Sequence, residues 1–292
     1  MNISAALVKE LRERTGSGMM ECKKALVDSS GDLELAIENM RKAGLAKADK
    51  KSGRTAAEGV IGVKLGADNK VAVVVDINCE TDFVAKAEDF VNFVNAVTQV
   101  ILSADVSTDE ELLAAKLEGD SSVDEVRRGL ISKLGENITI RRFQKYNADG
   151  GTAAYLHGSK IGVIVELAKA DAELGKDIAM HIAASKPECV SEDQVAPELI
   201  EKEKEIFSAQ AAESGKPAEI IEKMVVGRIG KYLAEITLLG QPFVKDDKIT
   251  VGKLVAAKGN QVLRFTRFEV GEGIEKKEEN FAEEVMAQVR GS

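Results

Sequence analysis

The connection between a predicted strand and a predicted helix contains an acidic residue, Asp82, followed by a large aromatic residue, Phe83. Residues 71–75 are continuous, apolar and β-branched, which is typical of a buried strand. Apolar residues then recur at helical spacing over residues 87–101. Connections run over the surface, so we expect Phe83 to be an exposed aromatic on a rigid mount, suited to non-covalent binding. The alternative is that Phe83 staples the following helix and Asp82 caps it.

Covalent catalysis has few candidate residues in this chain. The imidazoles are His157 and His181, and the thiols are Cys22, Cys79 and Cys189. The cysteines are odd in number and far apart, with no C-x-x-C pair, so neither a structural zinc site nor a disulfide framework is indicated. Reduced thiols in a cytoplasm fit this pattern. A nucleophilic cysteine paired with a histidine stays open, although no local motif supports it.

Simpler roles compete for three of these residues. Cys79 ends an apolar run and is expected to be a small buried hydrophobe. His181 lies between Ile178 and Ile182 on a predicted helix, which favours a structural histidine with its hydrogen bonds satisfied. His157 precedes a turn at Gly158, where it could contact a partner or stabilise the turn by a hydrogen bond.

Nucleotide-binding motifs do not occur. Neither G-x-x-x-x-G-K-[S/T] nor N-K-x-D, the two signatures of a GTPase, is present. Gly271 and Gly273 follow a predicted strand without the third glycine of a dinucleotide fingerprint. We therefore expect no bound cofactor and no metal ion in the chain itself.

Composition narrows the class of protein further. The length of 292 residues suggests about two domains, and the net charge of -9 argues against a general nucleic-acid binder. Residues 1–55 carry 11 basic and 8 acidic groups, and the basic run 41–54 has no aromatic residue for base stacking. No apolar run reaches 18 residues and no signal peptide begins the chain, so we expect no membrane contact and a cytoplasmic location.

The predicted fold class is α+β, beginning with a small helical unit. Residues 1–46 form a three-helix bundle that resembles the ubiquitin-associated type, with Gly44 as the C-terminal cap of its third helix. Residues 47–55 form a basic linker. Two α/β-sandwich core subdomains follow, the first at 56–148 and the second at 149–195 together with 237–273.

Each core subdomain is predicted as a strand hairpin followed by a helix. In the first, residues 137–143 alternate and should complete the sheet. Two helices precede them, each opened by a capping box, Thr108 with Glu111 and Ser122 with Glu125.

The second core subdomain is interrupted by an antiparallel helical hairpin at residues 196–236, broken at 214–217. The chain then returns through Gly240 to Val244, a short helix opening at Thr250 and a strand at 262–270. Residues 274–292 form a C-terminal helical module, whose apolar side is predicted to carry Phe281, Val285, Met286 and Val289.

Several runs of residues closely resemble bacterial translation elongation factor Ts. The resemblance spans nearly the whole chain in order, and residues 103–128 carry no family motif. The matching runs are residues 7–26, 31–44, 78–84, 157–158, 180–187, 240–244 and 267–276. That family is the guanine-nucleotide exchange factor of the GTPase elongation factor Tu.

The resemblance implies both a partner and a set of contact residues. The partner is elongation factor Tu, bound in its GDP form and its nucleotide-free form. The chain would disturb the Mg²⁺ and nucleotide site of that partner, promote GDP release and GTP reloading, and act without covalent chemistry. The implied contact residues are Met19, Met20, Lys23, Lys51, Thr81, Asp82, Phe83, Val84, Leu134, Gly135, His157 and Val244.

Simpler structural roles stay open for several of these contacts. One of Met19 and Met20 is expected in the bundle core, and Lys51 in a solvated linker. Gly135 could serve only as a C-cap and Val244 as part of a strand. An alternative function is a ubiquitin-associated-like adaptor, or an interaction protein that dimerises through the helical hairpin.

Overall fold

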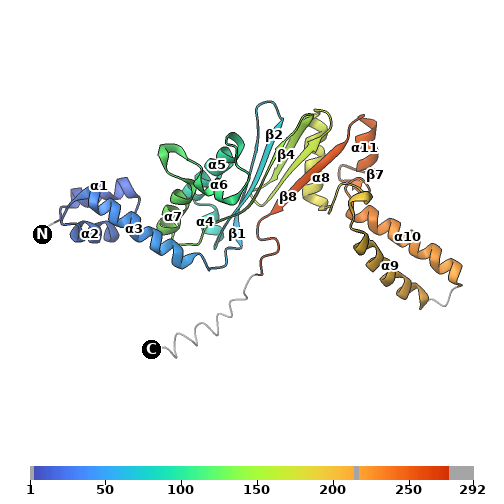
Figure 1. Cartoon of the computed structure of the whole chain (residues 1–292), viewed down its shortest axis with the longest axis horizontal. Coiled ribbons are helices and arrows are strands. Elements are labelled where there is room, and N and C mark those ends of the chain that lie inside the picture. Colours follow the sequence, from blue (N-terminus) through green and yellow to red (C-terminus); the bar gives the residue numbers. More distant parts are fainter. Residues whose placement is uncertain (1–2, 214–216, 276–292) are drawn as a thin grey trace.

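Three helices near the N-terminus form a small bundle at one end of an elongated molecule (Figure 1). The computed structural model describes residues 3–213 and 217–275. The helices are α1 (Ala5–Thr15), α2 (Met19–Asp28) and α3 (Leu33–Lys51). The core they share is built from Val8, Leu11, Cys22, Leu26 and Ala36. Gly16 ends α1 in the left-handed conformation, with φ of 65°, as the glycine-rich break predicts.

The third helix is longer than the sequence suggested. Gly44 was expected to cap it, and this prediction is wrong, because α3 continues to Lys51. A Cβ atom at Gly44 would lie 3.2 Å from the Ser132 side chain of α7 (Val123–Leu134), so the glycine permits close packing of α3 on α7. The predicted basic linker at 47–55 therefore begins inside a helix.

The first sheet is antiparallel, in the order β1-β2-β3, with the predicted third strand in place. Its strands are β1 (Glu58–Leu65), β2 (Val71–Cys79) and β3 (Thr139–Asn147). A one-turn helix, α4 (Asp82–Ala85), precedes the long helix α5 (Glu88–Ser103), which packs on β1 and β2. Helices α6 (Asp109–Ala114) and α7 both open with the predicted capping boxes, and a short 3-10 turn (Glu118–Asp120) lies between them.

A second three-stranded antiparallel sheet has the order β4-β5-β8. Its strands are β4 (Gly151–His157), β5 (Ile161–Leu167) and β8 (Val262–Glu269), with α8 (Ala172–Ser185) packed on β4 and β5. A two-stranded sheet, β6 (Pro242–Phe243) with β7 (Asp246–Thr250), leads into α11 (Val251–Ala257), which Thr250 caps as predicted. The fold class α+β is confirmed.

The two larger sheets share a buried layer. Alternation along β2 sends Val73 and Val75 towards the α5 side and Val74 towards the second sheet. Val74 and Ile164 lie in one buried cluster, and Gly162 lets the sheets approach, since a Cβ there would lie 2.3 Å from the Ile61 side chain. The core is therefore layered helix, sheet, sheet, helix, with α5 and α8 outside (Figure 1).

Helices α9 (Pro197–Ala212) and α10 (Ala218–Ile236) form the predicted hairpin at the other end of the molecule (Figure 1). Arg228 donates a hydrogen bond to Gln210 across it, at 2.9 Å. Residues 214–216 of the predicted break and the predicted C-terminal helix at 279–290 lie outside the described residues. Of the helices that are described, none is long and apolar enough to cross a membrane.

Candidate functional site

Phe83 projects from α4 with 81% of its surface exposed. Its neighbours on the same turn, Val84 and Ala85, are buried in the core of the first sheet. One face of the helix is thus anchored while the aromatic ring points outward. The predicted exposed aromatic is confirmed, and the alternative that Phe83 staples the next helix is wrong.

Thr81, and not Asp82, caps α4. The Thr81 hydroxyl accepts a hydrogen bond from the Val84 N–H, at 3.4 Å. Asp82 is the first residue of the helix, and its carboxylate pairs with Lys86 at 2.7 Å. The hydrogen bond from Lys86 lowers the pKa of the Asp82 carboxyl, so it is charged at neutral pH. The alternative that Asp82 caps the helix after Phe83 is wrong, because Thr81 caps α4 and Ala87 stands at the N-cap of α5.

The segment before Phe83 is held by Glu136, which follows the C-cap of α7. The Glu136 carboxylate accepts hydrogen bonds from the backbone N–H groups of Glu80 (3.1 Å) and Thr81 (2.9 Å) and from the Thr81 hydroxyl (2.6 Å). In return the Glu80 carboxylate accepts from the Asn137 N–H at 2.6 Å. Glu80, Glu136 and Asn137 were not among the site residues predicted from the sequence. Their one signal is a polar pair, Glu136 and Asn137, between a helix cap and a strand.

The end of α3 joins the same cluster. Lys51 donates a hydrogen bond from Nζ to the carbonyl oxygen of Gly135, at 2.5 Å. The buried Asn137 side chain donates to the carbonyl oxygens of Ser52 (3.3 Å) and Arg54 (2.8 Å). The structure therefore brings Lys51 and Gly135 beside the turn that carries Phe83.

Gly135 and Leu134 also have structural roles at this point. Gly135 is the left-handed C-cap of α7, with φ of 81°, as its alternative role predicts. Leu134 is half-buried and packs against the core of the first sheet. Both are therefore less available to a partner than Phe83.

His157 lies at the exposed end of β4, before the turn into β5. Its ring Nδ1 and the Tyr155 hydroxyl are 3.2 Å apart, within the strand, while its backbone carbonyl accepts a hydrogen bond from the Lys160 N–H across the turn, at 3.3 Å. Lys160 of that turn pairs with Glu58 of β1 at 2.7 Å, and its charge also contributes to the lowered pKa of Asp82. The β4–β5 turn therefore lies at the same end of the sheets as α4.

Met19 and Met20 stand at the start of α2, exposed to 61% and 77%. The expectation that one of them lies in the bundle core is wrong, because Cys22 and Leu26 fill that space. Lys23 is exposed on the same helix. A hollow of about 340 Å³ between α1 and α2 is lined by Ile3, Ala5, Val8, Lys9, Arg12, Met19, Met20 and Lys23.

Val244 lies in the turn between β6 and β7, so the strand alternative is wrong. Its N–H donates to Nδ1 of His181 at 3.2 Å, which leaves Nε2 to donate to the Gln241 side-chain oxygen at 2.9 Å. Burial lowers the pKa of His181, so the ring is neutral. His181 is the satisfied structural histidine that was predicted. It lies on α8 beside Phe243 of β6, so its bond to Val244 places that residue away from the Phe83 cluster.

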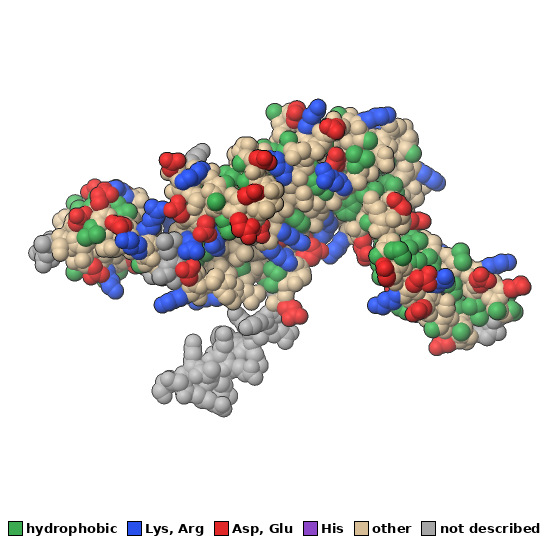
Figure 2. All heavy atoms as spheres, viewed as in Figure 1, with side chains coloured by type: hydrophobic (Ala, Val, Ile, Leu, Met, Phe, Trp, Pro, Cys, Tyr) green, Lys and Arg blue, Asp and Glu red, His purple; other side chains and the backbone are tan. Residues whose placement is uncertain are grey.

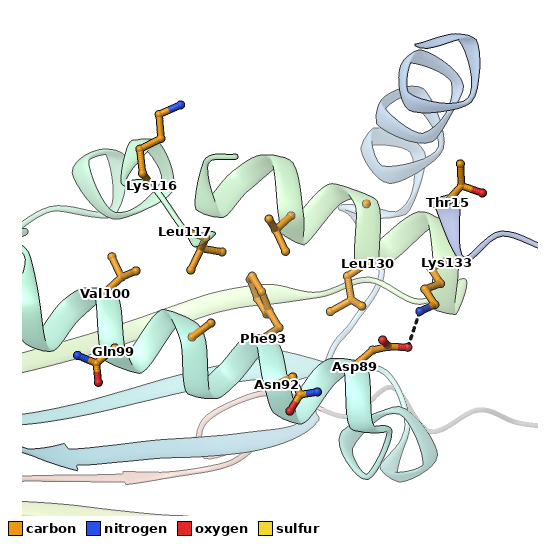
Figure 3. A pocket seen from close by; sticks show the side chains of 13 residues that line it. Thr15, Asp89, Asn92, Phe93, Gln99, Val100, Lys116, Leu117, Leu130 and Lys133 are labelled. Carbon is orange, nitrogen blue, oxygen red and sulfur yellow. Dashed lines mark ion pairs between the residues drawn. The ribbon is translucent and has the colours of Figure 1, made fainter. Parts of the chain in front are cut away.

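A groove of about 630 Å³ lies between α5 and α7 (Figure 3). Phe93, Val100, Leu117 and Leu130 line it, and Lys133 pairs with Asp89 at 2.8 Å beside it. The described residues that line it include no histidine or cysteine. Its chemistry is that of an apolar docking groove.

The Cys79 thiol is poorly suited to act as a nucleophile. Burial raises the pKa of the Cys79 thiol to about 12, which keeps it protonated and unreactive. No group of three or more His, Cys, Asp or Glu side chains within residues 3–213 and 217–275 is placed to hold a metal ion. What the arrangement offers is a rigidly mounted, exposed aromatic ring beside a charged carboxylate.

Comparison with known proteins points to one family. Residues 80–272 match the family model described as Elongation factor TS. The chain is 66% identical to elongation factor Ts of Methylococcus capsulatus (strain Bath) and 63% identical to that of Thioalkalivibrio sulfidiphilus, with 100% of each chain covered. It is 58% identical to elongation factor Ts of Legionella pneumophila (strain Philadelphia 1), with 99% of each chain covered.

Proposed function

Because the chain belongs to the elongation factor Ts family, we propose that it is the guanine-nucleotide exchange factor of the GTPase elongation factor Tu. It binds the GDP form, perturbs the Mg²⁺ and nucleotide site of its partner, and lets GDP leave and GTP enter. It also binds the nucleotide-free form that arises between these steps. It acts in the cytoplasm during translation elongation, without covalent chemistry.

The exposure of Phe83 on a firmly held turn is the observation that supports this proposal. Full burial of a phenylalanine side chain contributes about 1.5–3 kcal/mol. A thousandfold faster GDP release needs a barrier lower by about 4 kcal/mol. One ring inserted into an apolar pocket of the partner, together with displaced ligands of its Mg²⁺, is enough on this scale.

Coupling between the two ligands of the partner must be reciprocal. If this chain weakens GDP binding by some factor, GDP weakens binding of the chain by the same factor. A ring held on a rigid turn transmits this coupling better than one on a loop that yields. Asp82, charged and beside Phe83, is placed to draw a cation or a hydrogen-bond donor of the partner away from the Mg²⁺ site.

Other contacts extend the proposed interface. Thr81, beside Phe83, and His157, at the same end of the sheets, are proposed as further contacts, with Val84 a minor one because it is buried. Met19, Met20 and Lys23 form a second proposed contact on the bundle. The proposed minor contacts are Lys51, Leu134, Gly135 and Val244. Each already has an internal hydrogen bond or packs in the core, so less of it is available to a partner.

The α9–α10 hairpin is proposed as a self-association surface. Hydrophobic side chains gather over it on the face shown in Figure 2, and Ile206, Ile220 and Val226 are exposed. The division of the chain also stays a prediction: core subdomains at 56–148 and at 149–195 with 237–273, the hairpin at 196–236, and a C-terminal module at 274–292.

The test is release of a fluorescent GDP analogue from purified elongation factor Tu. Sub-stoichiometric amounts of this chain should accelerate release, because an exchange factor turns over. Absence of acceleration at every concentration would remove the proposal. Binding to a ubiquitin-type domain with no effect on GDP release would instead favour the adaptor alternative.

A further inference from the structure

The Glu136 carboxylate accepts three hydrogen bonds from the short segment that precedes Phe83. The N–H groups of Glu80 and Thr81 lie beyond Cys79, whose pairing with Glu58 is the last between β1 and β2. They have no strand partner at this point, and the Glu136 carboxylate accepts both, at 3.1 and 2.9 Å. Hydrogen bonds to a charged carboxylate are stronger than those to neutral acceptors. The carboxylate therefore fixes the backbone where the sheet ends.

The third donor connects this carboxylate to the start of α4. The Thr81 hydroxyl gives its hydrogen to Glu136 at 2.6 Å and uses a lone pair to accept from the Val84 N–H at 3.4 Å. Because one hydrogen of the hydroxyl is committed to Glu136, its lone pairs are oriented towards the helix. Glu136 thus orients the cap of the helix turn that carries Phe83.

Phe83 itself has little packing that could set its direction, since 81% of its surface is exposed. The direction of the ring must then come from the backbone of α4 and from what holds that backbone. We propose that Glu136 is a positioning residue for nucleotide exchange, acting through Thr81 to hold Phe83 at the angle at which it enters the partner. This proposal rests on the proposed exchange function.

If Phe83 is held at the wrong angle, the rate of GDP release should fall more than the affinity for the partner, because the other contacts of the interface are unchanged. Glu136→Gln places an amide where a carboxylate accepts three hydrogen bonds, and one end of that amide is itself a donor. We expect the maximal rate of GDP release to fall about tenfold, equivalent to about 1.4 kcal/mol. The concentration of the factor that gives half-maximal rate should change less than twofold.

The chain contains a matched control. Glu111 accepts the same three kinds of hydrogen bond, from Ser107 N–H (2.8 Å), Ser107 hydroxyl (2.8 Å) and Thr108 N–H (3.1 Å). These bonds cap α6 and involve no residue of α4. Glu111→Gln should therefore disturb its own helix cap to a similar extent and leave the exchange rate unchanged.

The experiment measures GDP release with the full chain carrying Glu136→Gln, Glu111→Gln, Phe83→Ala, or Glu136→Gln together with Phe83→Ala. If Glu136 acts through Phe83, its substitution should have little further effect once the ring is gone. An unchanged rate for Glu136→Gln, an equal loss for Glu111→Gln, or losses that multiply in the double variant would each overturn the proposal.

Hydrogen exchange on the free chain separates this proposal from the exchange function. The amides of Glu80, Thr81 and Val84 should exchange faster in Glu136→Gln than in Glu111→Gln, with no partner present. If the wild-type chain fails to accelerate GDP release, the proposed function fails, and this measurement still tests the hold on α4. Should Glu136→Gln not fold, Thr81→Val removes the hydroxyl that joins Glu136 to the cap of α4, and Thr81→Ser restores it. Equal GDP-release rates for these two variants would overturn the proposal.

Discussion

Two turns of the molecule present an exposed apolar side chain, and each is held from behind by a polar side chain of another element. Phe83 stands on α4, where the charged Glu136 accepts from three donors of the preceding segment. Val244 stands between β6 and β7, where the neutral His181 accepts one backbone N–H. Phe83 is 81% exposed and Val244 49%. The more exposed side chain has more hydrogen bonds behind it, which suits the wedge role proposed for Phe83.

Replacing the two exposed side chains should show the largest difference. Phe83→Ala is expected to slow GDP release about tenfold, on the scale of 1.4 kcal/mol per decade. Val244→Ala should slow it less than about twofold, since its smaller side chain lies in the β6–β7 turn, outside the Phe83 cluster. Thermal unfolding of both variants should match that of the wild type. A loss of several kcal/mol in folding stability for Phe83→Ala would show that the ring belongs to the core.

The charge beside the ring should have a smaller effect. Thr81 caps α4, so Asp82→Asn leaves the cap intact and removes only the charge and its exposed pairing with Lys86. We expect Asp82→Asn and Asp82→Ala to slow GDP release by the same factor, on the order of threefold. Rates would be measured at saturating factor. A silent Asp82→Asn beside a slow Asp82→Ala would mean that the side chain acts by shape or hydrogen bonding and not by charge.

The smallest effect expected is a pH dependence of folding stability that arises from His181, which accepts the Val244 N–H in the β6–β7 turn. The pKa of His181 is lowered by burial, so as pH falls through about 6.5 the unfolded chain takes up a proton before the folded chain does. The contribution of His181 to folding stability is therefore full above that pH and is lost as pH falls towards its lowered value.

Urea unfolding at pH 8, 7, 6 and 5 would measure this loss. The glutamine variant His181→Gln does not titrate, so the difference in unfolding free energy between wild type and variant should shrink as pH falls. A difference that is constant over this range would contradict the assignment of a neutral, buried imidazole.

The elements that carry local signals could be predicted from the sequence. The capping boxes at Thr108 and Ser122, the glycine break after α1 and the helical hairpin each depend on residues a few positions apart. Gly44 could not be placed in this way. A glycine suits a helix cap and a close helix contact equally, and its contact with Ser132 depends on how α3 packs on α7.

The candidate site could likewise be predicted where it depends on neighbouring residues, and not where it depends on contacts remote in sequence. Exposure of Phe83 follows from its place after a buried strand, and this was confirmed. Whether Asp82 caps a helix was left open from the sequence; Thr81 caps α4, and Glu136, which orients Thr81, is remote in sequence. The burial of one of Met19 and Met20 was predicted wrongly, because an apolar side chain alone does not show which helix positions face a small core. Cys22 and Leu26 fill that core.

The order of strands in the second sheet has a consequence for the chain while it is being made. β5 pairs on one side with β4, which precedes it, and on the other with β8, and about 95 residues separate Leu167 from Val262. At a synthesis rate of roughly 5–20 residues per second, one edge of β5 waits on the order of 5–20 seconds for its neighbour. An unpaired apolar edge is a template for wrong pairing during that interval. The α9–α10 hairpin emerges in the meantime, so this insertion lengthens the interval during which one edge of the nascent sheet is unpaired.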